Sequence, residues 1–145
     1  MKRNLNLIYK ESIDDIDWKE VPRLLELVGM GFTDAEKHRI SFENSFAAVF
    51  VFDTEKMIGL GRLISDGIRQ SALYDIAVDP EYQGYGVGRR IVELLINKTP
   101  GCNFILYASP GKEDFYRKLN FRKMKTGMAL FADPHRMSDG GFIEE

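Results

Sequence analysis

The spacing of apolar residues along the chain predicts a mixture of helices and strands. Two segments carry apolar residues every three or four positions, the spacing of one helix face. These faces are formed by Val21, Leu24, Leu25 and Val28 in the first segment and by Val87, Ile91, Leu94 and Leu95 in the second. Capping boxes at residues 17–20 and 33–36 predict the start of the first helix and of a short helix that follows it. Pro22 is an alternative start for the first helix, and Gly29 or Gly31 can end it.

Six runs rich in β-branched and aromatic residues predict strands. They cover residues 5–9, 46–52, 57–64, 72–78, 104–108 and 126–131. The second and third runs are close enough to form a hairpin, and residues 113–119 predict a further short helix that ends before Asn120. The predicted order is β-α-α-β-β-β-α-β-α-β, which indicates a mixed α/β (α+β) fold with an antiparallel meander followed by a strand–helix–strand crossover.

Composition indicates one ordinary globular domain over residues 1–145. The chain has 145 residues, of which 44% are hydrophobic and 29% charged. Residues 132–145 show no periodicity and are expected to form a mobile tail. The formal net charge is only −2, so a bulk basic protein that coats nucleic acid is excluded and no nucleic-acid partner is expected. Residues 86–127 nevertheless hold 9 basic and 3 acidic side chains, which suits either an anionic ligand or a solvated face.

The cysteine and histidine content indicates the cellular compartment of the protein and bears on whether it binds a metal. Cys102 is the only cysteine, so no intramolecular disulfide is possible and a reducing compartment is expected. The first residues lack the apolar core of a signal peptide, and no apolar run approaches 18 residues, so we expect a cytoplasmic protein without membrane contact. His38 and His135 are expected on the surface, and without a metal-type cluster of ligands no metal is expected.

The glycine-rich stretch at residues 83–88 is the motif that carries chemistry. It lies between a predicted strand and an amphipathic helix, where inward-pointing N–H groups and the helix N-terminus form a cradle for phosphate. A dinucleotide fingerprint needs a third glycine where Arg89 or Ile91 stands, and the Gly-Lys-Ser/Thr ending of a P-loop is absent. The alternative is a glycine-rich connector without a ligand, which is costly in chain entropy.

The glycine pattern that remains, Gln83-x-x-Gly86-x-Gly88, resembles the signature of the GNAT superfamily of acetyl-CoA-dependent N-acetyltransferases. The superfamily signature [R/Q]-x-x-G-x-G/A is matched by Gln83, Gly86 and Gly88. Residues 115–121 are similar to the downstream F-Y-x-K-x-G-F segment, with Asn120 in place of glycine, and both residues tolerate the left-handed conformation. The order of elements matches as well, and the resemblance covers about residues 5–131.

The resemblance implies a GNAT-like fold and acetyl-CoA as the cofactor. Backbone N–H groups of residues 84–89 would hold the pyrophosphate, and the strand edge at residues 76–78 would pair with the pantetheine arm. Arg89 is the best candidate for a side-chain contact to phosphate, ahead of Lys112, Arg117 and Arg122. The cofactor-binding residues expected on this basis are Ile76, Ala77, Val78, Gln83, Gly84, Tyr85, Gly86, Val87, Gly88, Arg89 and Phe115.

The family chemistry is direct attack of an amine on the thioester in a ternary complex. An alkylamine has a pKa of about 10, so a base or a water chain is required. Asp75 is the main candidate because a carboxylate is unexpected on an apolar strand; Glu43 and Tyr74 are lesser ones. The resemblance gives the oxyanion donor as a backbone N–H near Ala77 or Val78. It also makes Tyr116 the catalytic residue that donates to the leaving thiolate.

The acceptor is where the sequence is least informative. In the family, the first two helices and their loop form much of the acceptor site, which here means residues 28–32 with Phe42 and Phe46. Their apolar character and the compact chain favour a primary amine of a small molecule. The alternatives are protein lysine or N-terminal acetylation, and a non-catalytic acyl-CoA-binding module. Homodimers are common in the family, and residues 137–145 are candidates for such an interface.

Overall fold

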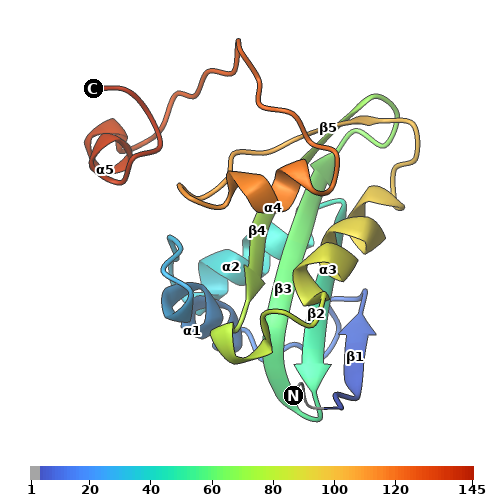
Figure 1. The fold of residues 1–145 in the computed structure, drawn as a ribbon. Helices are drawn as coiled ribbons and strands as arrows, with labels where there is room; N and C mark the ends of the chain where they lie inside the picture. The colour runs from blue at the N-terminus through green and yellow to red at the C-terminus, as the bar shows by residue number, and fades with distance from the viewer. Residues whose placement is uncertain (1–3) are drawn as a thin grey trace. The chain divides into compact units, whose positions relative to one another are not determined.

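Five strands form one sheet in the computed structural model, which describes residues 4–145 (Figure 1). Neighbouring strands pair in the order β1-β2-β3-β4-β5. The first four pair antiparallel, and β5 lies parallel to β4. The strands are β1 (Leu7–Lys10), β2 (Ala47–Asp53), β3 (Lys56–Ser65), β4 (Gln70–Val78) and β5 (Asn103–Ile105). This mixed, mostly antiparallel sheet with flanking helices confirms the predicted fold class.

The chain divides into two compact units. The first ends at Leu106, and the second begins at Tyr107. The first unit holds all five strands and most of the helical structure. Its helices are α1 (Glu20–Leu27), α2 (Ala35–Glu43), the 3-10 turn η1 (Pro80–Tyr82) and α3 (Val87–Ile96). The second unit contains the two short helices α4 (Glu113–Arg117) and α5 (Pro134–Asp139).

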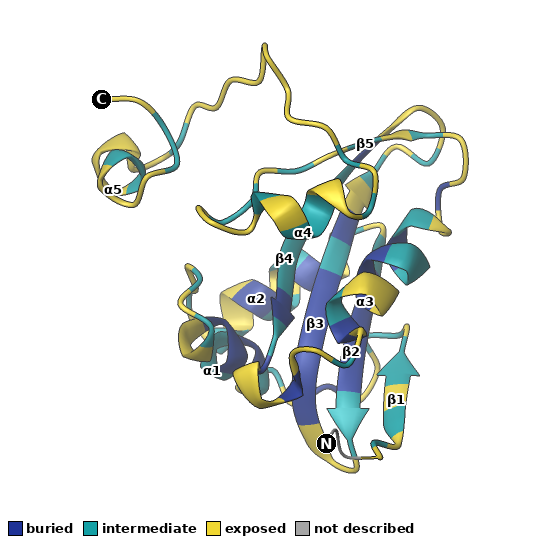
Figure 2. Cartoon of the chain, in the orientation of Figure 1, coloured by how far each residue is buried: buried dark blue, intermediate teal, exposed yellow. Residues whose placement is uncertain are grey.

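Alternating residues of β3 face opposite sides of the sheet and meet different helices. Leu60 belongs to the core cluster that α1 and α2 bury against the sheet. Gly59 and Gly61 face the other side, where the Ile91 side chain of α3 lies against them. Figure 2 shows β3 as buried over most of its length, because helices cover it on both faces. The two glycines leave the space into which α3 packs.

The observed start residues of α1 and α2 differ from the sequence predictions. The first helix begins at Glu20, between the two predicted starts, and no side chain caps it. Pro22 fits there because a first-turn residue needs no hydrogen-bonded N–H. In α2 the cap is Asp34 and not the preceding threonine, since the Asp34 carboxylate accepts the Lys37 N–H at 2.9 Å. Gly29 has a φ of +79° and ends α1, as predicted.

The predicted strand over residues 126–131 is wrong, because the structure has no strand there. Met128 is 98% exposed. An alternating pattern gives a strand only where a partner strand pairs with it, and the described part of the second unit contains no strand. The short helix α5 in the predicted tail was also missed, although Asp133 caps it and Pro134 starts it.

Within residues 4–145, no helix is long and apolar enough to cross a membrane. Among the same described residues, no three His, Cys, Asp or Glu side chains are grouped in a way that could hold a metal ion.

We predict that Gly61→Ala destabilises the protein. The added Cβ would lie 2.7 Å from the Ile76 Cδ1 and 2.8 Å from the Ile91 Cγ2, so α3 would have to shift. Overpacking of this kind raises the free energy of the folded state by about 1–3 kcal/mol. Urea unfolding measures the change. Gly127→Ala, whose Cβ meets its nearest neighbour at 3.5 Å, is the matched control. Equal midpoints for the two variants would contradict the packing argument.

Candidate active site

The strand β4 has an edge that β5 covers only in part. On one side β4 pairs with β3 up to Val78, whereas pairing with β5 ends at Ala72. The Asp79 N–H donates to the Ile58 carbonyl at 2.8 Å. Because antiparallel residues alternate in the direction of their backbone groups, the N–H and carbonyl of Val78 point away from β3, and those of Ala77 point toward it. The uncovered edge therefore presents the backbone of Val78.

A β-bulge at Asp75 sets this alternation. The register with β3 shifts by one residue between the pairs Arg62–Tyr74 and Leu60–Ala77. Asp75 has a φ of +59°, in the left-handed region that residues other than glycine rarely adopt. One extra residue in β4 turns both Tyr74 and Asp75 toward the side chain of Arg62.

Arg62 and Asp75 form a largely buried ion pair on the sheet face that carries α2. The Arg62 Nε lies 2.6 Å from the Asp75 Oδ2, and the two side chains are 17% and 19% exposed. The guanidinium also donates to the Ser45 hydroxyl at 3.3 Å and lies over the rings of Phe42 and Tyr74. The candidate base Asp75 is thus an oriented, paired carboxylate. Of the lesser candidates, Glu43 is paired with Arg39 on an exposed helix face.

The glycine-rich loop ends in a helix N-terminus that is free of acidic and capping side chains. Gly84 and Gly86 have φ values of +86° and +78°, and Gly86 is the N-cap of α3. No side chain caps this N-terminus, and no acidic residue lies in the first turn. Val87 points into the core and Arg89 pairs with Glu93 at 2.8 Å. The backbone N–H groups at the start of α3, rather than these side chains, are therefore the groups that the loop leaves open.

The hairpin between β2 and β3 anchors the start of this loop. Asp79 is buried, accepts the Glu81 N–H at 2.9 Å, and lies 3.6 Å from the Lys56 ammonium. The Tyr82 hydroxyl donates to the carboxylate of Asp53. In the same loop the Gln83 amide donates to the Val78 carbonyl at 3.2 Å. The first residue of the motif therefore ties the loop to the open edge of β4.

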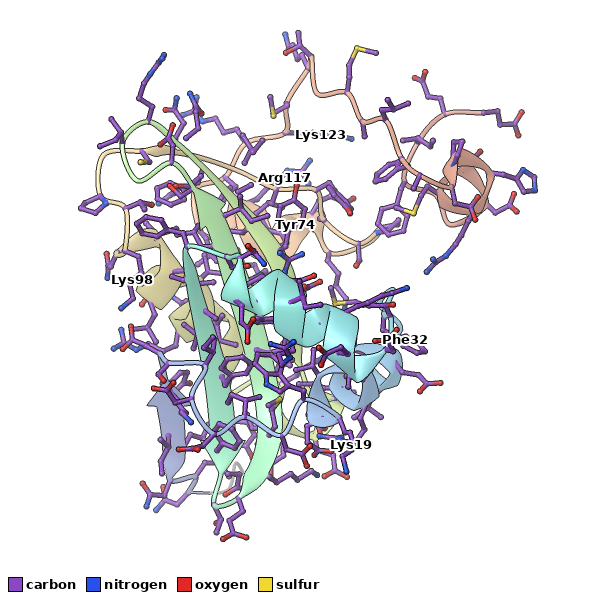
Figure 3. The ribbon with its side chains drawn as sticks, turned by 180° about the vertical axis from the view of Figure 1, so that it is seen from behind. Lys19, Phe32, Tyr74, Lys98, Arg117 and Lys123 are labelled. Carbon is purple, nitrogen blue, oxygen red and sulfur yellow. The ribbon has the colours of Figure 1, made fainter. Side chains whose placement is uncertain are left out.

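The loop between α1 and α2 (residues 28–34, the α1–α2 loop) exposes one aromatic ring. Phe32 is 49% exposed (Figure 3), and Phe46 is about half exposed as well. Phe42 was expected beside them but is only 2% exposed, because it packs in the core against Trp18 and Phe50. It therefore presents no surface to a ligand.

The prediction that His38 lies on the surface is wrong. His38 is 6% exposed, and its Nε2 accepts the N–H of Thr33 at 3.0 Å. Burial lowers its pKa below the usual 6.5. His135 is exposed, as expected, and pairs with Asp139 at 3.4 Å.

The second unit contains the other predicted site residues, Phe115 and Tyr116. Their rings meet edge to face with centroids 4.9 Å apart, and Phe121 packs on Tyr116 at 5.8 Å. Burial raises the pKa of Tyr116 to about 12, so its phenol stays protonated at neutral pH. Asn120 has a φ of +72°, as predicted for the position where the family has glycine.

Sequence reasoning missed Arg62, Lys56 and Tyr82, which organise the site without belonging to its motif. The sequence did contain a signal for Arg62. A lone arginine on an otherwise apolar strand needs a partner when it is buried, and so does the lone Asp75 on the next strand. No comparable signal marks Lys56 and Tyr82, because the contacts that they make depend on the tertiary fold.

Comparison with known proteins gives a family match over residues 45–123, to the acetyltransferase (GNAT) domain. The chain is 27% identical over 128 residues to the uncharacterized N-acetyltransferase ycf52 of Pyropia yezoensis, covering 83% of this chain and 74% of that one. It is 26% identical over 119 residues to the chloroplastic GCN5-related N-acetyltransferase 1 of Arabidopsis thaliana, covering 79% and 60%. It is 27% identical over 128 residues to the histone acetyltransferase TAP1 of Glycine max, covering 79% and 55%.

Solved structures agree with these sequence matches. A protein of unknown function from methicillin-resistant Staphylococcus aureus, described as a probable acetyltransferase, superposes with a TM-score of 0.74 at 26% identity. The match covers 86% of this chain and 99% of that one. A family match to more than half of the chain, a glycine-rich helix N-terminus beside an uncovered strand edge, and relatives named as N-acetyltransferases lead to one conclusion: the chain belongs to the GNAT family of acetyltransferases.

Proposed function

We propose that this enzyme transfers the acetyl group of acetyl-CoA to a primary amine of a small molecule, by direct attack in a ternary complex. One observation carries the proposal: the uncapped, glycine-rich N-terminus of α3 follows directly on the strand edge that β5 leaves uncovered. A pyrophosphate fits the first feature and an extended amide-bearing arm fits the second. Of the predicted cofactor residues, we propose Ile76, Val78 and residues 83–89 for these roles, because the backbone of Ala77 points toward β3.

The open edge also favours one of the two candidate oxyanion donors. Ala77 and Val78 were both candidates, but the N–H of Ala77 points toward β3. The N–H of Val78 points to the uncovered side, where it would donate to the carbonyl oxygen as negative charge develops. The Val78 carbonyl already accepts a hydrogen bond from the Gln83 side-chain amide at 3.2 Å.

The chemistry requires two proton movements. The nitrogen of a neutral amine attacks the acetyl carbon, the C–N bond forms, and the C–S bond breaks. The nitrogen then loses a proton, and the thiolate sulfur gains one. Bound acetyl-CoA would supply the acetyl group as a thioester. We propose Tyr116 as the donor to the sulfur, because its phenol is protonated and the family motif assigns this role to the tyrosine of residues 115–121. Phe115 would flank the cofactor.

We propose that Asp75 attracts the acceptor amine and removes its proton through water. The Arg62 ion pair keeps the carboxylate oriented, and the bulge fixes its backbone next to the strand edge. A direct proton transfer is not needed, since one bridging water relays the proton at little extra cost.

The acceptor class is proposed from two exposed rings, Phe32 in the α1–α2 loop and Phe46 just before β2. Phe32 and Phe46 offer apolar area for the body of an amine, and Asp75 offers a negative charge for its ammonium. Protein acetylation is the second candidate, favoured by the relative named as a histone acetyltransferase. A thiol-release assay with arylalkylamines, polyamines and peptides decides between them. Turnover only on peptides would favour the second candidate. Acetyl-CoA binding without turnover on any acceptor would indicate a non-catalytic acyl-CoA-binding module.

We propose further that both units belong to one acetyltransferase domain, because the family match runs from residue 45 to residue 123 and crosses the boundary between them. A cytoplasmic location and a homodimer stay predictions.

Gly86→Ala is predicted to weaken acetyl-CoA binding. At a φ of +78° the added methyl group strains the N-cap and intrudes on the cradle for phosphate. We expect the Kd of acetyl-CoA, measured by calorimetry, to rise about tenfold, as for the loss of one charge-assisted hydrogen bond. Gly101→Ala is the matched control, because Gly101 has a φ of +85° and the same open surroundings but follows α3 instead of starting it. Equal losses of affinity in both variants would refute a role in the cradle.

Tyr116→Phe is predicted to lower kcat at least tenfold, in the range of a lost proton donor, with the acetyl-CoA KM within about twofold of wild type. The phenyl ring keeps the packing against Phe115 and Phe121 and removes only the hydroxyl. Since burial raises the pKa of Tyr116 to about 12, its ionisation should not reduce kcat of the wild type up to pH 10. Tyr107→Phe in the same unit is the control. A wild-type kcat in Tyr116→Phe would remove this residue from the mechanism.

A further inference from the structure

His38 is buried in a helix that is otherwise mostly polar. Only two residues of α2 are buried, His38 and Phe42, four positions apart on the same face. Phe42 packs in the aromatic core with Trp18 and Phe50. An imidazole in such a place needs a hydrogen-bond partner. The partner is the backbone of the α1–α2 loop.

The α1–α2 loop is held at both ends and exposed in between. At its start, the Met30 N–H donates to the Leu25 carbonyl at 2.9 Å, and the Met30 side chain packs on the core. At its end, the Thr33 N–H donates to the His38 Nε2 at 3.0 Å. Gly31 and Phe32 lie exposed between these two attachments. The His38 bond thus fixes the second end of the segment that presents Phe32.

This attachment exists only while the imidazole is neutral. An Nε2 that accepts a backbone N–H must carry a lone pair, which places the ring proton on Nδ1. The charged groups that act on His38 come from three elements: Asp75 on β4 and Asp34 at the start of α2 favour the imidazolium, and Arg62 on β3 opposes it. Burial outweighs them and lowers the pKa of His38.

We propose that His38 is a positioning residue for acceptor binding: its neutral ring holds Thr33, and acidification releases the α1–α2 loop without affecting acetyl-CoA binding. The proposal rests on the proposed function for the role of this loop. The unfolded histidine titrates near pH 6.5 and the folded one lower. The unfolded state therefore binds more protons below pH 6.5, and the contribution of neutral His38 to stability, complete above that pH, is lost as the pH falls.

Two variants separate the hydrogen bond from mere burial. His38→Gln places an amide oxygen where Nε2 lies and does not titrate, so it should keep the bond at every pH. His38→Leu fills the space without an acceptor. At pH 7.5 we expect His38→Leu to raise the acceptor KM about fivefold, as for the loss of one hydrogen bond, with the acetyl-CoA KM unchanged. His38→Gln should match wild type.

The pH dependence is the decisive kinetic readout. The acceptor amine itself gains protons as the pH falls, but this effect is the same in all variants. The ratio of wild-type to His38→Gln acceptor KM should therefore be near one at pH 7.5 and rise about fivefold at acid pH. A ratio that stays constant with pH would overturn the proposal, as would an equal rise of both KM values in His38→Leu.

An NMR titration tests the attachment independently of activity. In wild type the Thr33 amide resonance should titrate with a midpoint below pH 6.5, and in His38→Gln it should not. The Met30 amide, bonded to Leu25, is the internal control and should stay unchanged. A Thr33 amide that fails to titrate overturns the inference even if the enzyme is active. A normal titration in a protein that acetylates no amine would instead refute the proposed function and leave the attachment established. If His38→Leu does not fold, His38→Gln alone decides.

Discussion

At Asp75 the strand β4 gains one residue relative to β3, and the backbone takes a left-handed conformation at an aspartate. Such a conformation raises the free energy by about 1–2 kcal/mol, and the ion pair with Arg62 helps to offset it. The extra residue reverses the direction of every later backbone group in β4. Without it, the N–H of Ala77 rather than that of Val78 would point to the uncovered edge. The bulge therefore decides both where the Asp75 carboxylate lies and which backbone amide faces the uncovered edge of β4.

The glycine-rich loop that we propose for the cofactor begins where this strand ends, and contacts on both sides of the sheet position it. Gly59 and Gly61 let α3 pack closely on β3, which sets where its N-terminus lies. The β2–β3 hairpin holds the start of the loop through Asp79 and Tyr82. The positive φ values of Gly84 and Gly86 and the uncapped end of α3 form the cradle that we propose for the cofactor pyrophosphate. Preorganised backbone donors of this kind lose little entropy when an anion binds.

Local patterns in the sequence predicted much of the fold and the conformation of the glycine-rich loop before α3. Helical and alternating spacings found α1, α3 and β2 to β4, because these elements bury one or both faces. Gly84 and Gly86 were informative because few residues other than glycine adopt the positive φ that the backbone has there. Arg62 and Asp75 each carried a signal as a lone charged residue on an apolar strand, but their pairing and the role of His38 depend on partners from other parts of the fold. The strand prediction for residues 126–131 was wrong for a similar reason. A strand needs a partner strand, and a local sequence pattern does not show whether one is present.

The most direct test of this account is amide hydrogen exchange with and without coenzyme A. Edge amides that gain a bound partner exchange more slowly, whereas amides already paired in the sheet do not change. The account predicts slower exchange at Val78 and in the first turn of α3 when coenzyme A is present, with no change at Ala77. Equal protection of Ala77 and Val78, or protection only outside β4 and α3, would contradict it.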